Sequence, residues 1–433
     1  MRMYDIIYKK RMGNELTRDE IKFAVNGYVN GEIPDYQMSA LLMAICFQGM
    51  TGSETFNLTE LMMKSGDVVD LSCIDGISVD KHSTGGVGDK TTLIVAPIVA
   101  SLGAKVAKMS GRGLGFTGGT VDKLESIPGY RTSLSPTEFL DNVRKCGVAV
   151  TGQSGNLAPA DKKLYALRDV TATVDSIPLI ASSIMSKKLA SGADTIVLDV
   201  KTGNGAFMKT LDGSYALARA MVDIGKSFDK NMRALITDMS APLGMNVGNS
   251  LEVKEAIEVL SGKGDPDLYE ICIALSASII SAAFKLEYTE AESRCKNAIS
   301  NGSALSKMKE WISMQGGDAT YIDNPEKLYT SPIKVDYLSK TEGYVSEINA
   351  ESVGIGSMLL GAGRKTKDDI IDLGAGIVLK SKIGQYVKKG QALATMYTSN
   401  KDLVSQCEKM LDSAFLIADT KPQLTKLIHA IIE

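Results

Sequence analysis

Two glycine-rich segments of the sequence combine small residues with lysines and hydroxyl side chains. The first runs from Asp80 to Thr92 and contains Lys81, His82 and Ser83. Glycines let a backbone approach a ligand closely, and the N–H groups at the start of a following helix attract anions. Lysine adds a positive charge, and hydroxyl groups donate hydrogen bonds to an oxyanion. The pattern therefore predicts a phosphate-binding loop.

Two nucleotide-binding motifs fit these segments poorly. A P-loop needs glycine immediately before its lysine, and here Asp89 precedes Lys90. The second segment, residues 110–120, contains G-x-G-x-x-G after a predicted strand, which is typical of dinucleotide sites. That interpretation needs an acidic residue about 20 positions further on, and position 133 is serine. A tight turn without a ligand stays open for either loop considered alone.

The sequence is poor in residues that bind transition metals. Its two histidines are His82 in the first glycine loop and His429 near the C-terminus, and its six cysteines include no C-x-x-C pair. We therefore expect no zinc site, and the scattered thiols are typical of a reducing, cytoplasmic compartment. A lone histidine is usually structural, so His429 is assigned no role, whereas His82 lies beside Lys81 in a loop suited to a ligand.

Strand and helix patterns alternate around the glycine loops, which is typical of a parallel sheet with crossover connections. Because both loops follow strands, they are expected at the carboxyl edge of this sheet, where ligands of α/β proteins bind. The predicted strands lie at residues 77–80, 105–109, 148–151, 194–200 and 233–238.

Helical patterns precede this sheet and interrupt it. Three or four helices are expected before residue 66, and capping boxes at 17–20 and 51–54 open two of them. Helical segments at 161–175 and 179–191 then break the alternation. Such an interruption is expected where a chain returns to an earlier domain.

The C-terminal part of the chain has short strand patterns with glycine turns and ends with helical patterns at 401–415 and 422–432. The expected fold is α/β with a separate all-α domain: a central, parallel-rich mixed sheet flanked by helices, plus a β-rich C-terminal α+β domain. The expected domains are an all-α domain of residues 1–66 completed by 161–192, an α/β phosphate-binding domain of 70–160 and 193–334, and a C-terminal domain of 335–433.

Charge and hydropathy exclude two classes of partner. The 433 residues include 48 Lys and Arg against 51 Asp and Glu, a net charge of −3. This balance gives no electrostatic basis for binding nucleic acid or an anionic membrane. No uninterrupted apolar run approaches the ~18 residues of a membrane span. We therefore expect neither a nucleic-acid nor a membrane partner.

Several segments resemble the thymidine/pyrimidine-nucleoside phosphorylase family. Residues 110–125 match its signature at every position, and 81–89 resemble its phosphate loop. The resemblance extends through essentially the whole chain and is strongest to bacterial members that accept both uridine and thymidine. Further matching segments are 153–161, 168–174, 182–188 and 242–244.

This resemblance implies a transferase reaction in which a pyrimidine nucleoside and phosphate give free base and a pentose 1-phosphate, as in nucleoside salvage. His82, Arg168 and Lys187 are the expected catalytic residues: the two cations stabilise charge on base oxygens, and His82 donates a hydrogen bond or a proton. The residues expected to hold phosphate are Lys81, Ser83, Thr92, Lys108, Ser110 and Thr120, and those expected to hold the base are His82, Arg168, Ser183 and Lys187.

The resemblance also implies how the site works and assembles. The family's fold divides the site between two domains, so closure is expected about hinges near residues 66–71, 153–159 and 191–194. It implies a homodimer, and in some bacterial members a monovalent cation such as potassium. Lys90 and Asn246 depart from the residues usual at the cation site, and a lysine ammonium there would weaken or replace the cation. The residues that map to this site are Gly88, Lys90, Leu243, Asn246 and Glu255.

Two other functions are compatible with the same fold. An anthranilate-type phosphoribosyltransferase shares the fold and a glycine loop, but it needs an acidic pair for magnesium pyrophosphate, which is not found where that chemistry requires it. A non-catalytic nucleoside or phosphate sensor does not need the full set of Lys81, His82, Ser83, Arg168 and Lys187. We therefore prefer phosphorolysis, with inorganic phosphate as co-substrate and no organic cofactor.

Overall fold

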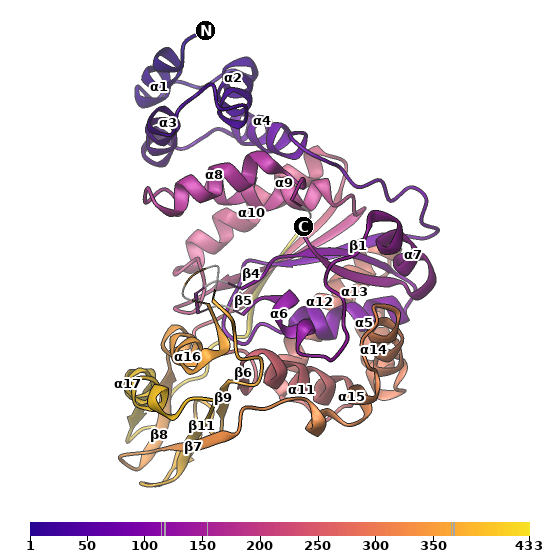
Figure 1. Ribbon diagram of the computed structural model, residues 1–433, viewed down its shortest axis with the longest axis vertical. Coiled ribbons are helices and arrows are strands. Elements are labelled where there is room, and N and C mark those ends of the chain that lie inside the picture. Colours follow the sequence, from indigo (N-terminus) through magenta and orange to yellow (C-terminus); the bar gives the residue numbers. More distant parts are fainter. Residues whose placement is uncertain (114, 117, 154, 365, 367–368) are drawn as a thin grey trace.

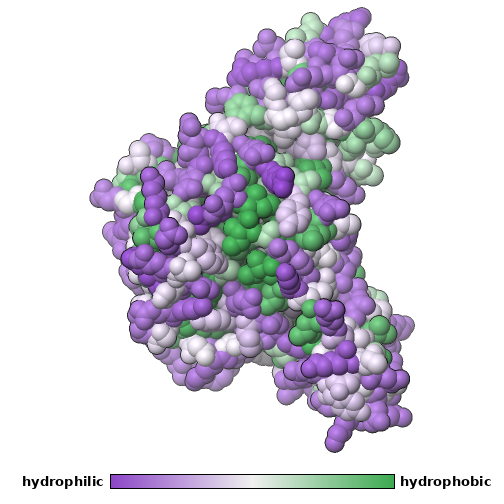
Figure 2. Space-filling view, turned by 180° about the vertical axis from the view of Figure 1, so that it is seen from behind, coloured by the Kyte–Doolittle hydropathy of each residue, from purple (hydrophilic) through white to green (hydrophobic). Residues whose placement is uncertain are grey.

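The computed structural model describes residues 1–433 except 114, 117, 154, 365, 367 and 368 (Figure 1). Three lobes follow one another along the long axis. N-terminal helices form one end, an α/β lobe forms the middle, and a β-rich C-terminal lobe forms the other end. Seen from behind, the most apolar residues of the surface gather on the middle lobe (Figure 2).

The N-terminal lobe is a helical bundle that includes a segment from later in the chain. Both predicted capping boxes are present, at Thr17 and Thr51. Leu164 and Leu167 of the later segment are buried in the same apolar core as the first four helices. The helices are α1 (Met3–Arg11), α2 (Arg18–Val29), α3 (Asp35–Gln48), α4 (Gly52–Met63) and α8 (Pro159–Asp169). α9 (Ile177–Ala190) contributes to two cores, since its Leu179 belongs to the bundle core and its Met185 to a core shared with the sheet.

The middle lobe contains a six-stranded sheet in the order β13-β5-β4-β1-β2-β3. Strands β1 to β5 run parallel to one another and correspond to the five predicted strands. β13 runs antiparallel to β5. The strands are β1 (Ser78–Ser83), β2 (Lys105–Ser110), β3 (Val148–Gly152), β4 (Thr195–Thr202), β5 (Asn231–Asp238) and β13 (Ile428–Ile432).

Helices cover both faces of this sheet. In β4, Ile196 and Leu198 join the core formed with α9 and α10, while Val197 joins the opposite core, which includes α5 and α12. α12 has the length and apolarity of a membrane span, but 78% of it is buried inside the protein, so it is a core helix. The helices are α5 (Thr91–Ser101), α6 (Thr120–Glu125), α7 (Pro136–Cys146), α9 (Ile177–Ala190), α10 (Leu211–Ser227), α11 (Asn249–Leu260), α12 (Pro266–Phe284), α13 (Tyr288–Ser300), α14 (Ser303–Met314) and α15 (Thr320–Asp323).

The C-terminal lobe contains two antiparallel sheets, in the orders β10-β8-β12 and β6-β9-β11-β7. β6 comes from the loop after β5, so this loop links the middle lobe to the C-terminal one. The elements are β6 (Asn246–Val247), β7 (Ile333–Leu338), β8 (Gly343–Ile348), α16 (Ala350–Ser357), β9 (Gly376–Leu379), β10 (Tyr386–Val387), β11 (Ala392–Thr398), α17 (Val404–Ala414) and β12 (Phe415–Ala418).

Two predicted helices were wrong in whole or part. Residues 422–432 do not form a helix, because Ile428–Ile432 pair with β5 as the edge strand β13. Tertiary pairing here overrides the local pattern. The helix predicted over 161–175 ends at Asp169. The chain turns there, with Ala172 at a φ of +54°, and Arg168 binds the carbonyl groups of the turn.

Candidate active site

Both glycine loops begin at the same edge of the sheet, as predicted. β1 and β2 are parallel neighbours, and they end at Ser83 and Ser110 respectively. Behind these ends, Lys81, Thr92 and Lys108 line one small cavity between the sheet and α5. The structure therefore brings together three of the residues predicted to bind phosphate.

Lys81 lies in a buried network of charges. Its ammonium donates a hydrogen bond to Thr91 Oγ1 and forms ion pairs with Asp199 Oδ2 at 3.3 Å and Asp89 Oδ1 at 3.9 Å. Burial alone would raise the pKa of Asp89, but the ammonium groups of Lys81 and Lys201 outweigh burial and hold it well below its usual value. The loop carboxylate is therefore ionised and fixes the lysine beneath the loop.

Asp80 is the centre of a second charge cluster. Lys108 Nζ lies 3.3 Å from Asp80 Oδ1, and Lys188 Nζ of α9 donates to Asp80 Oδ2 over 2.7 Å. The attraction of both lysines outweighs the effect of burial and lowers the pKa of Asp80. Burial lowers the pKa of Lys108 to about 8, against the attraction of Asp80. This lysine is thus near its titration point at mildly alkaline pH.

His82 is surrounded by positive charge. Burial, followed by the ammonium groups of Lys188 and Lys108, holds the pKa of His82 well below its usual value, and Lys187 and Lys81 add to the effect. The imidazole is therefore neutral at neutral pH. It can donate a hydrogen bond from its N–H, but it holds no extra proton, so the predicted role as a proton donor does not fit this environment.

Two of the predicted base-binding residues contact each other on α9. Lys187 Nζ donates to Ser183 Oγ over 3.2 Å and also to Asp161 Oδ2 of α8. The spacing of four residues on a helix produces the first contact, as predicted. Asp161 was not predicted, and it orients the ammonium group from the neighbouring helix.

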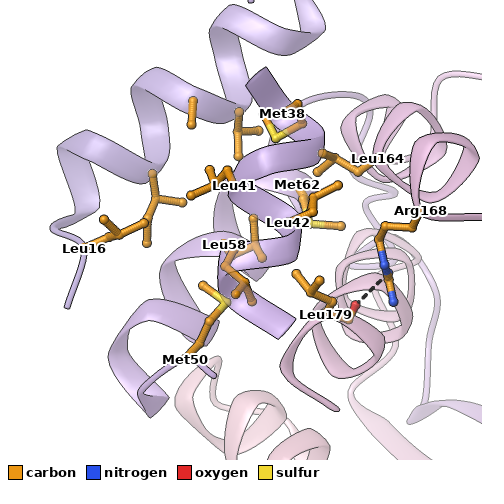
Figure 3. Close-up of a pocket in the computed structure, with 14 residues that line it drawn as sticks. Leu16, Met38, Leu41, Leu42, Met50, Leu58, Met62, Leu164, Arg168 and Leu179 are labelled. Atoms are coloured by element: carbon orange, nitrogen blue, oxygen red, sulfur yellow. Dashed lines mark hydrogen bonds between the residues drawn. The ribbon is translucent and has the colours of Figure 1, made fainter. Parts of the chain in front are cut away.

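The Arg168 side chain is bound by backbone carbonyl groups of the turn after α8 and of α9. Its guanidinium group donates to the carbonyl oxygens of Thr173 (3.1 Å), Leu179 (3.1 Å) and Val174 (2.8 Å). It borders an apolar hollow lined by leucine and methionine side chains of the helical bundle (Figure 3). This hollow holds only about 30 Å³, which is room for one water molecule and not for a pyrimidine ring. These three bonds use three of the five guanidinium N–H groups and leave two that they do not use.

The other predicted phosphate residues lie at the loop ends. Ser83 Oγ accepts a hydrogen bond from the Gly85 N–H over 3.2 Å, and Thr120 is the first residue of α6. Ser110 lines a hollow of about 880 Å³, which has the size of a small-molecule site. This hollow is also lined by Asp67–Asp70 and Gln153, which belong to predicted hinge segments.

The described residues of the three predicted hinge segments, which leave out residue 154, lie side by side. The Asp67 N–H donates to the Asn156 carbonyl over 3.0 Å, and the Val69 N–H donates to the Ala190 carbonyl over 2.8 Å. A Cβ on Gly66 would lie 1.9 Å from the Asn156 oxygen. Glycine is therefore required where the first two segments touch, and all three connections between the helical and α/β lobes meet in one place.

Besides Asp161, sequence reasoning missed four further buried charged residues of the site: Asp80, Lys188, Asp199 and Lys201. Asp199 pairs with Lys201 at 2.9 Å as well as with Lys81. The signal was present, because β4 is an otherwise apolar strand and an ionised side chain in such a strand needs a buried partner. The partner of Asp199 is Lys81, and only the register between the two strands identifies it: Ser83 of β1 lies opposite Asp199 of β4, and Lys81 lies two residues before Ser83.

The residues predicted to hold a monovalent cation converge on a lysine ammonium instead. Lys90 Nζ donates to the carbonyl oxygens of Leu243 (2.7 Å) and Asn246 (2.9 Å) and to Glu255 Oε2 (2.6 Å). The carbonyl of Gly88 accepts from the Lys90 backbone N–H over 2.9 Å. Because an ammonium group has three donors and no acceptor, Lys90 cannot be a cation ligand. These residues do not fit the expected potassium ion.

Comparisons with known proteins agree with this arrangement of lobes. Family profiles described as a glycosyl transferase helical bundle domain and a glycosyl transferase a/b domain match residues 4–66 and 75–305. A profile described as the pyrimidine nucleoside phosphorylase C-terminal domain matches residues 344–418. Among solved structures, anthranilate phosphoribosyltransferase from Thermus thermophilus has a TM-score of 0.57 at 17% identity, over 72% of this chain and 99% of that one. At this identity the likeness concerns the fold alone.

Full-length relatives define the family. Pyrimidine-nucleoside phosphorylase from Geobacillus stearothermophilus is 56% identical over 99% of both chains, and the proteins of that name from Staphylococcus epidermidis and Bacillus subtilis are 56% and 54% identical over the whole of both chains. Because these matches span the full length, they include all three lobes. The chain therefore belongs to the pyrimidine-nucleoside phosphorylase family.

Proposed function

We propose that the chain catalyses the phosphorolysis of pyrimidine nucleosides. Inorganic phosphate and uridine, thymidine or deoxyuridine give the free base and ribose or deoxyribose 1-phosphate. One observation carries this proposal: relatives named pyrimidine-nucleoside phosphorylase are 54–56% identical to the chain over essentially its full length. Phosphate enters as co-substrate, and the proposal needs no organic cofactor.

The proposed phosphate site is the carboxyl edge of β1 and β2. The buried ammonium groups of Lys81 and Lys108 support this role, because charges bind phosphate more strongly where water is excluded. Hydroxyl groups at the ends of the two strands and on α5 and α6 supply further donors. The proposed phosphate-binding residues are Lys81, Ser83, Thr92, Lys108, Ser110 and Thr120.

The proposed base site comprises His82, Arg168, Ser183 and Lys187. A phosphate oxygen attacks the anomeric carbon while the C–N glycosidic bond breaks, and the electrons of that bond pass to the pyrimidine ring. Lys187 and Arg168 stabilise the charge that develops on the base oxygens, and the neutral imidazole of His82 donates a hydrogen bond to one of them. Positioning and electrostatics supply most of the rate.

Closure of the helical lobe on the α/β lobe is proposed to bring the two half-sites together. In the unliganded protein Arg168 donates to carbonyl oxygens of the turn after α8 and of α9, and this use of its donors within the helical lobe supports an open arrangement. The meeting of the three hinge segments supports rotation about one place. The proposed domains are residues 1–66 with 161–192, residues 70–160 with 193–334, and residues 335–433, except that β13 (Ile428–Ile432) pairs with the sheet of the second domain.

The proposed assembly is a homodimer in the cytoplasm. Exposed aromatic residues on α1 and α3 support a contact between subunits, since Tyr4, Tyr36 and Phe47 are 66%, 73% and 81% exposed and such residues are enriched in interfaces. The six free cysteine thiols support a reducing compartment.

Phosphorolysis is tested by following the absorbance of uridine, thymidine and cytidine with and without phosphate. We expect uridine and thymidine to react only with phosphate present. Cytidine should be poor, because its amino group would face the cationic donors Arg168 and Lys187, and sites built to hydrogen-bond one group reject a mismatch strongly. Base release without phosphate, or equal kcat/KM for cytidine and uridine, would contradict the proposal.

A further inference from the structure

Lys90 is one of several fully buried charged residues near the glycine loops. Its side chain is fully buried, and all three donors of its ammonium group are used, by two backbone carbonyl oxygens and one carboxylate oxygen. Carbonyl and carboxylate oxygens converging on one point form a site for a cation. In this chain the single positive charge at that point is covalently attached to the loop.

The acceptors around Lys90 are held in place independently of it. Glu255 also accepts from the backbone N–H groups of Met245 (2.6 Å) and Asn246 (2.9 Å). A Cβ on Gly244 would lie 2.5 Å from Glu255 Oε1, so the loop before β6 is folded tightly around this carboxylate. A shorter side chain at position 90 would leave this cradle of oxygen atoms with an uncompensated negative charge.

Lys90 lies between two residues that contact the ammonium group of Lys81. Thr91 Oγ1 accepts a hydrogen bond from Lys81 and donates one to Asp89 Oδ1 over 2.6 Å. Fixing Lys90 therefore fixes Asp89 and Thr91, and these fix Lys81. This chain of contacts makes Lys90 a positioning residue for the phosphate half-site.

We propose that the Lys90 ammonium group permanently takes the place of a monovalent cation, so that this protein needs no potassium for stability or for activity. The charge anchors the first glycine loop to the loop before β6 and to α11, and through Asp89 and Thr91 it positions Lys81. That activity needs no potassium rests on the proposed function, whereas that stability needs no potassium does not.

The first test uses the protein as it is, with phosphate varied as its potassium, sodium or tetramethylammonium salt at equal ionic strength and no other monovalent metal ion present. We expect the melting temperature and the KM for phosphate to be the same in all three, within about twofold for KM, because no cation binds the folded state selectively. A melting temperature or activity that rises with potassium and saturates would overturn the proposal. The melting curve gives this answer even if no nucleoside is cleaved.

The second test is Lys90→Ser, which empties the cradle and offers a hydroxyl group. In tetramethylammonium we expect a lower melting temperature and a KM for phosphate raised at least about tenfold. Potassium should restore both in a saturable way, because a cation that binds only the folded state stabilises it by mass action. A folded variant with no response to potassium would overturn the proposal. If this variant does not fold, the wild-type comparison still decides.

Lys10→Ser is the matched control. Lys10 is also a buried lysine, and it pairs with Glu54 at 2.8 Å in the helical bundle, but among the residues that the structure describes only the two carboxylate oxygens of Glu54 accept from its ammonium group. We expect this variant to be destabilised without any rescue by potassium. Equal rescue of both variants would show a general salt effect and would overturn the proposal.

Discussion

Lys188 Nζ donates a hydrogen bond to Asp80 Oδ2 over 2.7 Å, and this contact joins α9 to β1. α9 carries Ser183 and Lys187 of the proposed base site, and β1 carries Lys81 and His82. Both partners are buried, so solvent screens the pair weakly. This ion pair therefore links the helix of the proposed base site directly to the strand of the proposed phosphate site.

Removal of this ion pair should weaken the protein and the base site together. We expect Lys188→Met to lower the free energy of unfolding by about 2–4 kcal/mol, because a buried charge loses its partner, and to raise the KM for uridine. Chemical denaturation and steady-state kinetics measure both effects. Lys162→Met, at an exposed position of α8, is the control and should change stability by less than about 0.5 kcal/mol. Wild-type stability and KM in Lys188→Met would contradict the assigned contact.

The lowered pKa of His82 predicts a neutral imidazole in the folded protein. Nitrogen NMR of the side chains should show His82 neutral at pH 6, and His429→Gln assigns the signals because the chain has two histidines. In Lys188→Met the pKa of His82 should rise, since one repelling charge is gone. The unfolded chain binds a proton near pH 6.5 that the folded chain does not, so His82 lowers stability as the pH falls below that value. A His82 that titrates at its ordinary pKa would contradict this prediction.

The pKa of Lys108, about 8, predicts how phosphate binding depends on pH. Phosphate is held by the ammonium form, and above pH 8 the fraction of that form falls about tenfold per pH unit. The KM for phosphate should therefore rise above pH 8. Lys108→Arg keeps its charge at alkaline pH and should move this rise to higher pH. A pH profile that is the same in both proteins would exclude Lys108 as the titrating group.

Gly66 provides a test of the hinge. We expect Gly66→Ala to lower the free energy of unfolding by about 1–3 kcal/mol, because its Cβ would meet the Asn156 carbonyl. In small-angle scattering, phosphate plus a non-reactive pyrimidine analogue should reduce the radius of gyration of the wild type, and less so that of the variant. Gly52→Ala, whose Cβ would have no neighbour within 4 Å, is the control. Equal scattering of free and liganded wild type would contradict closure.

Local patterns predicted most of the fold. The capping boxes at Thr17 and Thr51 and the five parallel strands were identified because their signals lie within a few residues of the sequence. The strand β13 was missed because only its pairing with β5 makes Ile428–Ile432 extended. The end of α8 was missed because the Arg168 side chain, bound to carbonyl groups of the turn, stabilises that turn.

The candidate site was predictable where residues share one loop or one helix face. Lys81 and Ser83 belong to one loop, and Ser183 and Lys187 are neighbours on α9. The pairs that set the charge of the site, Lys188 with Asp80 and Lys81 with Asp199, join residues more than a hundred positions apart, and only the order of the strands reveals them. The same holds for Lys90, whose acceptors come from a distant loop and from α11.

The most direct test of the account is the KM for phosphate in Lys81→Ala, measured with uridine as the second substrate. A hydrogen bond to a charged group is worth ~1.5–3 kcal/mol, so we expect a loss of about ten- to a hundredfold in kcat/KM for phosphate. Lys10→Ala, which removes a buried lysine of the helical bundle, should lower stability but leave the KM for phosphate unchanged. Unchanged phosphate kinetics in a folded Lys81→Ala protein would contradict the assignment of the phosphate site.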